Sequence, residues 1–161
     1  MNTDLSIEFF PPQTPEGVEK LRAVRAKLAV LKPSFFSVTF GAGGSTRERT
    51  FSIVKEMVTE GLPAAPHLSC IGSTHSNIRD ILSQYREAGI RRIVALRGDL
   101  PSGMAEAGEF RYANELVEFI RAETGNHFQI AVAAYPEWHP QARYPQDDLH
   151  AFARKAKAGA D

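Results

Sequence analysis

Short apolar segments alternate five times with longer segments whose apolar residues have helical spacing, and few folds accommodate such a pattern. The short segments are LSIEFF (5–10), FFSVTF (35–40), AAPHLSCI (64–71), RIVALRG (92–98) and QIAVAAY (129–135). After each one, apolar residues recur at intervals of three and four, which predicts a strand followed by a helix. Strands joined by crossover helices pair in parallel, so the sequence predicts an α/β fold.

Two architectures fit this alternation, an open doubly wound sheet and a TIM (βα)8-type barrel. A barrel takes about 250 residues, or about 31 for each of eight units, so a chain of 161 residues matches about the first five units. An open five-stranded sheet has the same length, so length alone does not decide between them.

The polarity of the strands favours the barrel. In three segments, small or polar residues occupy alternate positions: Ser6 and Glu8, Ser37 and Thr39, His67 and Ser69. A strand buried on both faces of an open sheet would be apolar almost throughout. A barrel with a ligand site at its mouth can carry a polar inner face. We therefore predict one incomplete barrel domain over residues 1–161 that stops before a sixth strand.

Charge and cysteine content disfavour several classes of function. Nineteen Lys and Arg balance nineteen Asp and Glu, so no overall field attracts nucleic acid or an anionic membrane. Cys70 is the only cysteine, and no Cys/His cluster has metal-ligand spacing. The start has no secretory pattern and no apolar run approaches the length of a membrane span. We expect a cytoplasmic protein with no metal, nucleic-acid or membrane ligand.

Residues capable of chemistry gather at or just after the carboxyl ends of the predicted strands. They are Glu8, Thr39, GAGGST (41–46), His67, Arg97-Gly98-Asp99 and the segment from Tyr135 to His139. Ligands bind at this rim in both barrels and open α/β sheets. The shared position of these residues predicts one site.

Glu8 has two interpretations. At the end of an apolar strand, loss of hydration would suit its carboxyl group to act as a general acid near neutral pH. Alternatively, Glu8 pairs with a cation such as Arg97 and has no catalytic role. The residues alone leave both open.

The other candidates also have structural alternatives. The GAGGST loop could bind an anion through its amides, or could be only a tight turn. Arg97 and Asp99 could contact a ligand or form a salt bridge at the rim, and His67 alone could be a hydrogen-bonded core residue. The YPEWHP loop could pack against a planar heterocycle or form a structural corner. Asp148 and Lys155 share a helix face that is ordinarily solvated.

Seven segments in order resemble the methylenetetrahydrofolate reductase family and span nearly the whole chain. They are EFFPP, SVTFGAGGSTRERT, APHLSC, IVALRGDLP, FRYANELV, VAAYPEWHP and DLHAFARKAKAGAD. The resemblance implies a (βα)8 barrel that binds FAD and uses NADH or NADPH to reduce 5,10-methylenetetrahydrofolate to 5-methyltetrahydrofolate, for methionine synthesis.

The resemblance also implies roles for individual residues. Glu8 matches the general acid that assists opening of the folate ring to a 5-iminium cation, and Asp99 matches a carboxylate near flavin and pterin that favours this cation. The matching cofactor-binding positions are Thr39, Phe40, His67, Arg97, Gly98, Asp99, Tyr112, Ala113, Tyr135, His139, Ala142, Asp148, Arg154 and Lys155. Arg154 and Lys155 suit the diphosphate.

Some positions depart from the family pattern. Phe40 stands where many relatives have Tyr, Trp138 where they have a smaller residue, and Ala151 where some have a polar one. The family also continues past AGAD with a sixth strand that bears a folate-contacting glutamine.

These departures keep two other interpretations open: a non-catalytic truncated barrel with weak or no flavin binding, and a phosphate-binding barrel enzyme of different chemistry. Unpaired strand edges would favour association, so we expect a homo-oligomer.

Overall fold

The computed structural model describes residues 4–41, 46–99, 108–135, 137–140 and 142–161. Five strands alternate with five helices over these residues, as the sequence predicts. Their bounds are β1 Ser6–Phe9, α1 Pro15–Ala29, β2 Phe35–Val38, α2 Arg47–Thr59, β3 Ala64–Ser69, α3 His75–Glu87, β4 Arg92–Leu96, α4 Ala113–Thr124, β5 Gln129–Val132 and α5 Pro145–Lys157. Part of the GAGGST loop, residues 42–45, lies outside the described residues.

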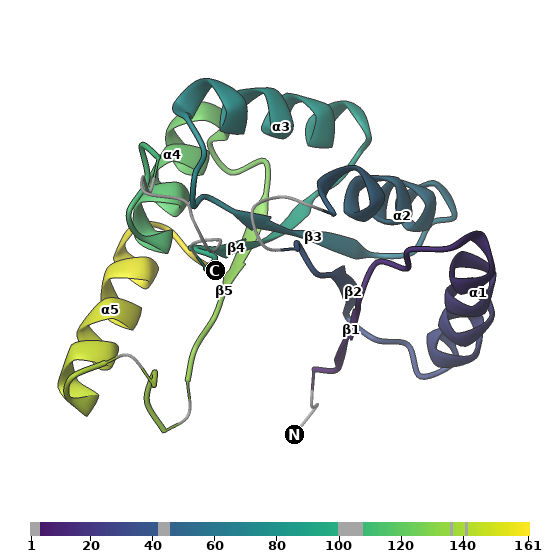
Figure 1. The fold of residues 1–161 in the computed structure, drawn as a ribbon, viewed down its shortest axis with the longest axis horizontal. Helices are drawn as coiled ribbons and strands as arrows, with labels where there is room; N and C mark the ends of the chain where they lie inside the picture. Colours follow the sequence, from purple (N-terminus) through teal and green to yellow (C-terminus); the bar gives the residue numbers. More distant parts are fainter. Residues whose placement is uncertain (1–3, 42–45, 100–107, 136, 141) are drawn as a thin grey trace.

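The strands form one parallel sheet in the order β1-β2-β3-β4-β5. Each strand therefore pairs with the next one along the chain. Figure 1 shows the helices in an arc along one side of this sheet, from α1 at one end to α5 at the other. A doubly wound sheet reverses its strand order and carries helices on both faces. The sequential order and one-sided helices are those of a barrel segment, which confirms the predicted fold class.

Local signals in the sequence set the helix ends. Thr14 Oγ1 accepts a hydrogen bond from the Gly17 amide at 3.1 Å, and Pro15 occupies the first turn of α1, where its missing N–H costs nothing. Thr74 caps α3 in the same way. Gly89 follows α3 with a φ of +75°, a conformation that side chains with a Cβ rarely adopt.

The hydrophobic core lies between the sheet and the helices. From the strands it includes Phe36, Leu68, Ile93 and Ile130, which point to the helix side and are at most 1% exposed. The helices contribute a larger buried set: Val54 and Met57 of α2, Ile78, Ile81, Leu82 and Tyr85 of α3, and Leu116, Val117 and Ile120 of α4. Each buried large aliphatic side chain stabilises the fold by about 1.5–3 kcal/mol. This apolar layer packs the helices against the sheet.

The opposite face of the sheet carries the alternating polar residues. Register pairs Glu8 of β1 with Ser37 of β2 and Ser37 with Ala65 of β3, so these residues share a face with His67. Ser37 and His67 are buried, while Glu8 at the edge strand is exposed. The polar inner face predicted from the sequence is therefore present.

Arg121 fixes the far end of α5 against α4 and β5. Its guanidinium donates hydrogen bonds to the carbonyls of Gly159 at 2.8 Å and Phe128 at 2.7 Å, and to Asp161 Oδ2 at 2.8 Å. Asp161 in turn hydrogen-bonds the backbone of Ile130 through its own amide and carboxylate. These contacts orient α5, which forms a wall of the pocket described below.

None of the described helices is long and apolar enough to cross a membrane.

Leu82→Ala tests the core assignment. Leu82 is 1% exposed, so the substitution should lower the free energy of unfolding by about 2–5 kcal/mol through lost burial and a residual cavity. Leu31→Ala is the matched control, because Leu31 is 60% exposed; its effect should stay within about 0.5 kcal/mol. Denaturant unfolding measures both. Equal losses in the two variants would contradict the core as described.

Candidate functional site

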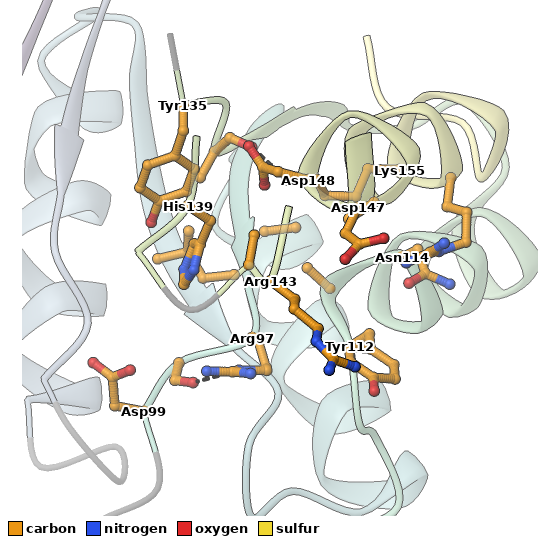
Figure 2. A pocket seen from close by; sticks show the side chains of 18 residues that line it. Arg97, Asp99, Tyr112, Asn114, Tyr135, His139, Arg143, Asp147, Asp148 and Lys155 are labelled. Atoms are coloured by element: carbon orange, nitrogen blue, oxygen red, sulfur yellow. Dashed lines mark hydrogen bonds between the residues drawn. The ribbon is translucent and has the colours of Figure 1, made fainter. Parts of the chain in front are cut away.

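A cavity of about 600 Å³ opens at the carboxyl ends of β4 and β5, between the start of α4 and the inward side of α5 (Figure 2). Such a volume is typical of small-molecule and cofactor sites. Eighteen residues line it: Ala95, Leu96, Arg97, Gly98, Asp99, Tyr112, Ala113, Asn114, Ala133, Tyr135, His139, Ala142, Arg143, Asp147, Asp148, Ala151, Arg154 and Lys155.

The cavity brings together most of the residues that sequence reasoning assigned to cofactor binding. Those that line it are Arg97, Gly98, Asp99, Tyr112, Ala113, Tyr135, His139, Ala142, Asp148, Arg154 and Lys155. They come from four separate stretches of the chain, which the parallel sheet aligns at one edge. Glu8, Thr39, Phe40 and His67 are not among its lining residues and lie on β1, β3 and the end of β2.

Sequence reasoning missed three polar residues of this lining: Asn114, Arg143 and Asp147. Asn114 follows Tyr112 and Ala113 in the first turn of α4, and Asp147 precedes Asp148 in the first turn of α5. Both residues could therefore have been predicted, because each is next in sequence to a residue that was assigned to the site. Arg143 belongs to no motif that was singled out.

Gly98 allows a sharp turn beneath the cavity. Its φ is +82°, and a Cβ at this position would lie 2.0 Å from Ser69 Oγ. The Ser69 hydroxyl donates a hydrogen bond to the Arg97 carbonyl at 2.9 Å, so the backbone turns directly over the end of β3. Arg97 Nε also donates to the Gly98 carbonyl at 3.1 Å. The turn holds Arg97 and Asp99 at the cavity wall.

The α5 wall combines charge with buried hydrogen bonding. Lys155 donates from Nζ to the Ala133 carbonyl at the end of β5. Partial burial lowers the pKa of Lys155, and the nearby Asp148 carboxylate partly opposes that effect. Opposite, the rings of Tyr135 and His139 meet edge to face with centroids 4.6 Å apart. The wall thus offers cationic donors beside aromatic surface.

Glu8 pairs with His67 across the polar face of the sheet. His67 Nε2 lies 3.2 Å from Glu8 Oε2, and the Glu8 side chain is 52% exposed. The burial expected for Glu8 at the end of an apolar strand is therefore not found, and the residue beside its carboxyl group is His67, where Arg97 was one example of a possible partner.

His67 is buried and its pKa is lowered, chiefly by desolvation, with the negative charge of Glu8 acting in the opposite direction. Desolvation therefore disfavours the charged form of the imidazole, whose Nε2 faces the Glu8 carboxyl group. The pair bridges β1 and β3 over Ser37.

Thr39 and Phe40 continue β2 toward the same rim. The Thr39 amide donates to the Phe9 carbonyl at 3.0 Å, and the Thr39 carbonyl accepts from Thr50 Oγ1 at 2.8 Å. Phe40 is partly buried and packs against the core.

In the described ranges, no group of three or more His, Cys, Asp or Glu side chains is arranged to hold a metal ion.

Gly98→Ala should destabilise the chain more than Gly61→Ala, its matched control. Both glycines have a φ of +82°, but a Cβ at Gly61 meets nothing within 4 Å. Each alanine carries the backbone penalty of about 1–2 kcal/mol, and overpacking at Gly98 adds about 1–3 kcal/mol. Denaturant unfolding compares the two variants. Adding Ser69→Ala to Gly98→Ala removes the hydroxyl that the new Cβ meets, so it should restore part of the extra stability lost at Gly98. Equal losses of stability in Gly98→Ala and Gly61→Ala would refute the steric role.

The lowered pKa of His67 predicts a pH dependence of stability. Unfolding restores the ordinary pKa of His67. At a pH below that value but above the folded-state pKa, the unfolded state binds a proton that the folded state does not. Stability should therefore fall as the pH drops below about 6.5 toward the lower folded value. His67→Gln, which keeps an amide donor, should flatten this fall in pH-dependent unfolding. His150→Gln, at an exposed position of α5, should not; identical profiles for all three proteins would contradict the assignment.

Comparisons with known proteins identify the family of the chain. A sequence model of the family described as methylenetetrahydrofolate reductase matches residues 1–161. The 5,10-methylenetetrahydrofolate reductase of Pectobacterium carotovorum subsp. carotovorum is 48% identical over 160 residues, which are 98% of this chain and 52% of that protein. The Escherichia coli (strain K12) protein of the same name is 46% identical over 159 residues, with the same coverage. The chain thus spans about half the length of these bacterial relatives.

Solved structures support the fold alone. A phosphoenolpyruvate phosphomutase from Streptomyces platensis subsp. rosaceus aligns with a TM-score of 0.59 at 16% identity, over 100% of this chain and 58% of that one. A Schiff-base-forming fructose-1,6-bisphosphate aldolase aligns with a TM-score of 0.50 at 13% identity, over 84% of this chain and 51% of that one. Both of these proteins are TIM-barrel enzymes. Because the family match covers every residue from 1 to 161, the chain belongs to the methylenetetrahydrofolate reductase family.

Proposed function

We propose that this chain supplies the FAD-binding part of a reductase that converts 5,10-methylenetetrahydrofolate to 5-methyltetrahydrofolate with NADH or NADPH. The observation that carries the proposal is one cavity that eleven of the fourteen predicted cofactor-binding positions line, at the ends of β4 and β5 and along α4 and α5. Family membership gives those positions their meaning. Bound FAD would accept a hydride from the nicotinamide and deliver it to the folate.

The residues of the cavity fit a flavin dinucleotide. Arg97, Arg154 and Lys155 provide cationic donors for a diphosphate. Tyr112 and the Tyr135–His139 pair provide flat surface for ring systems; Tyr112 directly precedes α4, and the pair lies between β5 and α5. The turn at Gly98 keeps a side chain out of the wall, which allows close approach of a ligand to the backbone.

In the proposed reaction, Glu8 acts as the general acid. Its carboxyl group, when protonated, would give its proton to the ring nitrogen that leaves as the five-membered ring of the folate opens. The Glu8 carboxyl is accessible and oriented by His67 at 3.2 Å. Asp99, at the cavity wall, would place negative charge near the cation that forms on the substrate.

The second candidate is a flavin-holding module without turnover of its own. The chain covers 52% of the bacterial relatives, and Glu8 is 52% exposed where a closed barrel would enclose it.

Leu149 and Phe152 of α5 are also exposed, at 64% and 40%. This unpartnered apolar surface supports the proposal that the chain forms a homo-oligomer.

Three measurements on the purified chain separate these candidates. FAD binding is followed by quenching of flavin fluorescence, reduction of the bound flavin by NADH or NADPH by loss of its visible absorbance, and reoxidation by methylenetetrahydrofolate by recovery of that absorbance. The reductase proposal expects all three. Binding without reoxidation supports the flavin-holding module, and no FAD binding refutes both.

Glu8→Gln tests the acid role. The variant should bind FAD and undergo reduction by the nicotinamide like the wild type, because Glu8 does not line the cavity. Reoxidation by methylenetetrahydrofolate should slow by about 10²–10⁴-fold, the usual contribution of a positioned acid. Stopped-flow absorbance measures each half-reaction separately. An equal loss in both half-reactions would reject the role.

A further inference from the structure

We propose that Arg143 is a diphosphate-binding residue of this cavity, a role that no motif and no family match assigned to it. The inference rests on the proposed flavin site and deepens it. Arg143 lines the cavity together with its neighbours Ala142 and Asp147. In Figure 2 its side chain extends from the loop before α5 into the cavity, in the direction of the Tyr112 ring.

The backbone on both sides of Arg143 is fixed by hydrogen bonds. The Ala142 amide donates to the His139 carbonyl at 2.8 Å and closes the turn before it. The Asp147 amide donates to the Tyr144 carbonyl at 3.0 Å and opens α5 after it. The base of the arginine side chain is therefore held in place, which reduces the entropy lost on binding.

The guanidinium is also supported from one side. Arg143 Cζ lies 5.8 Å from the centroid of the Tyr144 ring, within the range of a cation–π contact. The N–H groups of a guanidinium can match two phosphate oxygens at once. In the described part of the chain, Arg143 forms no salt bridge with a carboxylate within 4.0 Å.

Two of the other three cations of the wall also donate hydrogen bonds to backbone carbonyls. Lys155 donates to the Ala133 carbonyl, and Arg97 donates to the Gly98 carbonyl. Four cationic side chains, those of Arg97, Arg143, Arg154 and Lys155, face three carboxylates, those of Asp99, Asp147 and Asp148. The wall therefore carries one more cation than carboxylates, an excess that favours an anionic ligand and to which Arg143 contributes.

The test measures the dissociation constants of FAD, ADP and riboflavin for the wild-type chain and its variants. Arg143→Ala should weaken FAD and ADP about 10- to 100-fold, the range expected for a lost hydrogen bond to a charged group. Riboflavin, which has no phosphate, should bind both proteins equally. Arg143→Lys keeps the charge but cannot form two parallel hydrogen bonds to a phosphate. Its dissociation constants for FAD and ADP should therefore lie between those of the wild type and Arg143→Ala. The slope of log Kd against log salt should decrease in Arg143→Ala for FAD.

Arg49→Ala is the matched control, since Arg49 is an exposed residue of α2 away from the cavity; its three constants should equal the wild-type values. Thermal unfolding of every variant monitors the fold. Unchanged FAD and ADP binding in Arg143→Ala, or an equal loss for riboflavin, would overturn the assignment.

If the wild type binds ADP through Arg143 but does not bind FAD, the diphosphate role stands and the flavin proposal fails. If it binds neither, both fail.

Discussion

Burial of the outer face of the sheet under the helices is the constraint on which everything else depends. Side chains from β2 to β5 and from α2 to α4 fill one continuous apolar layer, so the sheet can expose only its other face to ligand. Because the crossovers return each strand beside the previous one, every carboxyl end lies at the same edge. The cavity is a consequence of this order, since its walls come from four stretches of chain that only the sheet aligns.

Much of this architecture could be predicted from sequence because it depends on local patterns. Period-two polarity identified the inner face that carries Glu8 and His67, and the Thr-Pro pair at residues 14 and 15 marked the start of α1. The family resemblance then supplied most of the cavity lining. Polarity distinguished barrel from open sheet, although length could not.

Partners across strands could not be predicted in the same way. The sequence offered Arg97 as one example of a partner for Glu8, whereas His67 is the residue found 3.2 Å away. Register places Glu8 in the row of Ser37 and Ala65, and His67 lies two residues further along β3 on the same face. This offset reflects how the strands are staggered, which no residue spacing within a single strand encodes. Arg143 was missed for a related reason, because its place in the wall depends on the fold of the loop between β5 and α5.

Hydrogen–deuterium exchange of the chain with and without FAD tests the central claim most directly, namely that the aligned edge at β4 and β5 forms one dinucleotide site. The account predicts slower exchange on FAD addition in the turn at residues 97–99, the first turn of α4 and the segment from Ala133 through α5. Exchange in α1 and α2 should remain unchanged. Protection confined to α1 and α2, or spread evenly over the chain, would contradict the account.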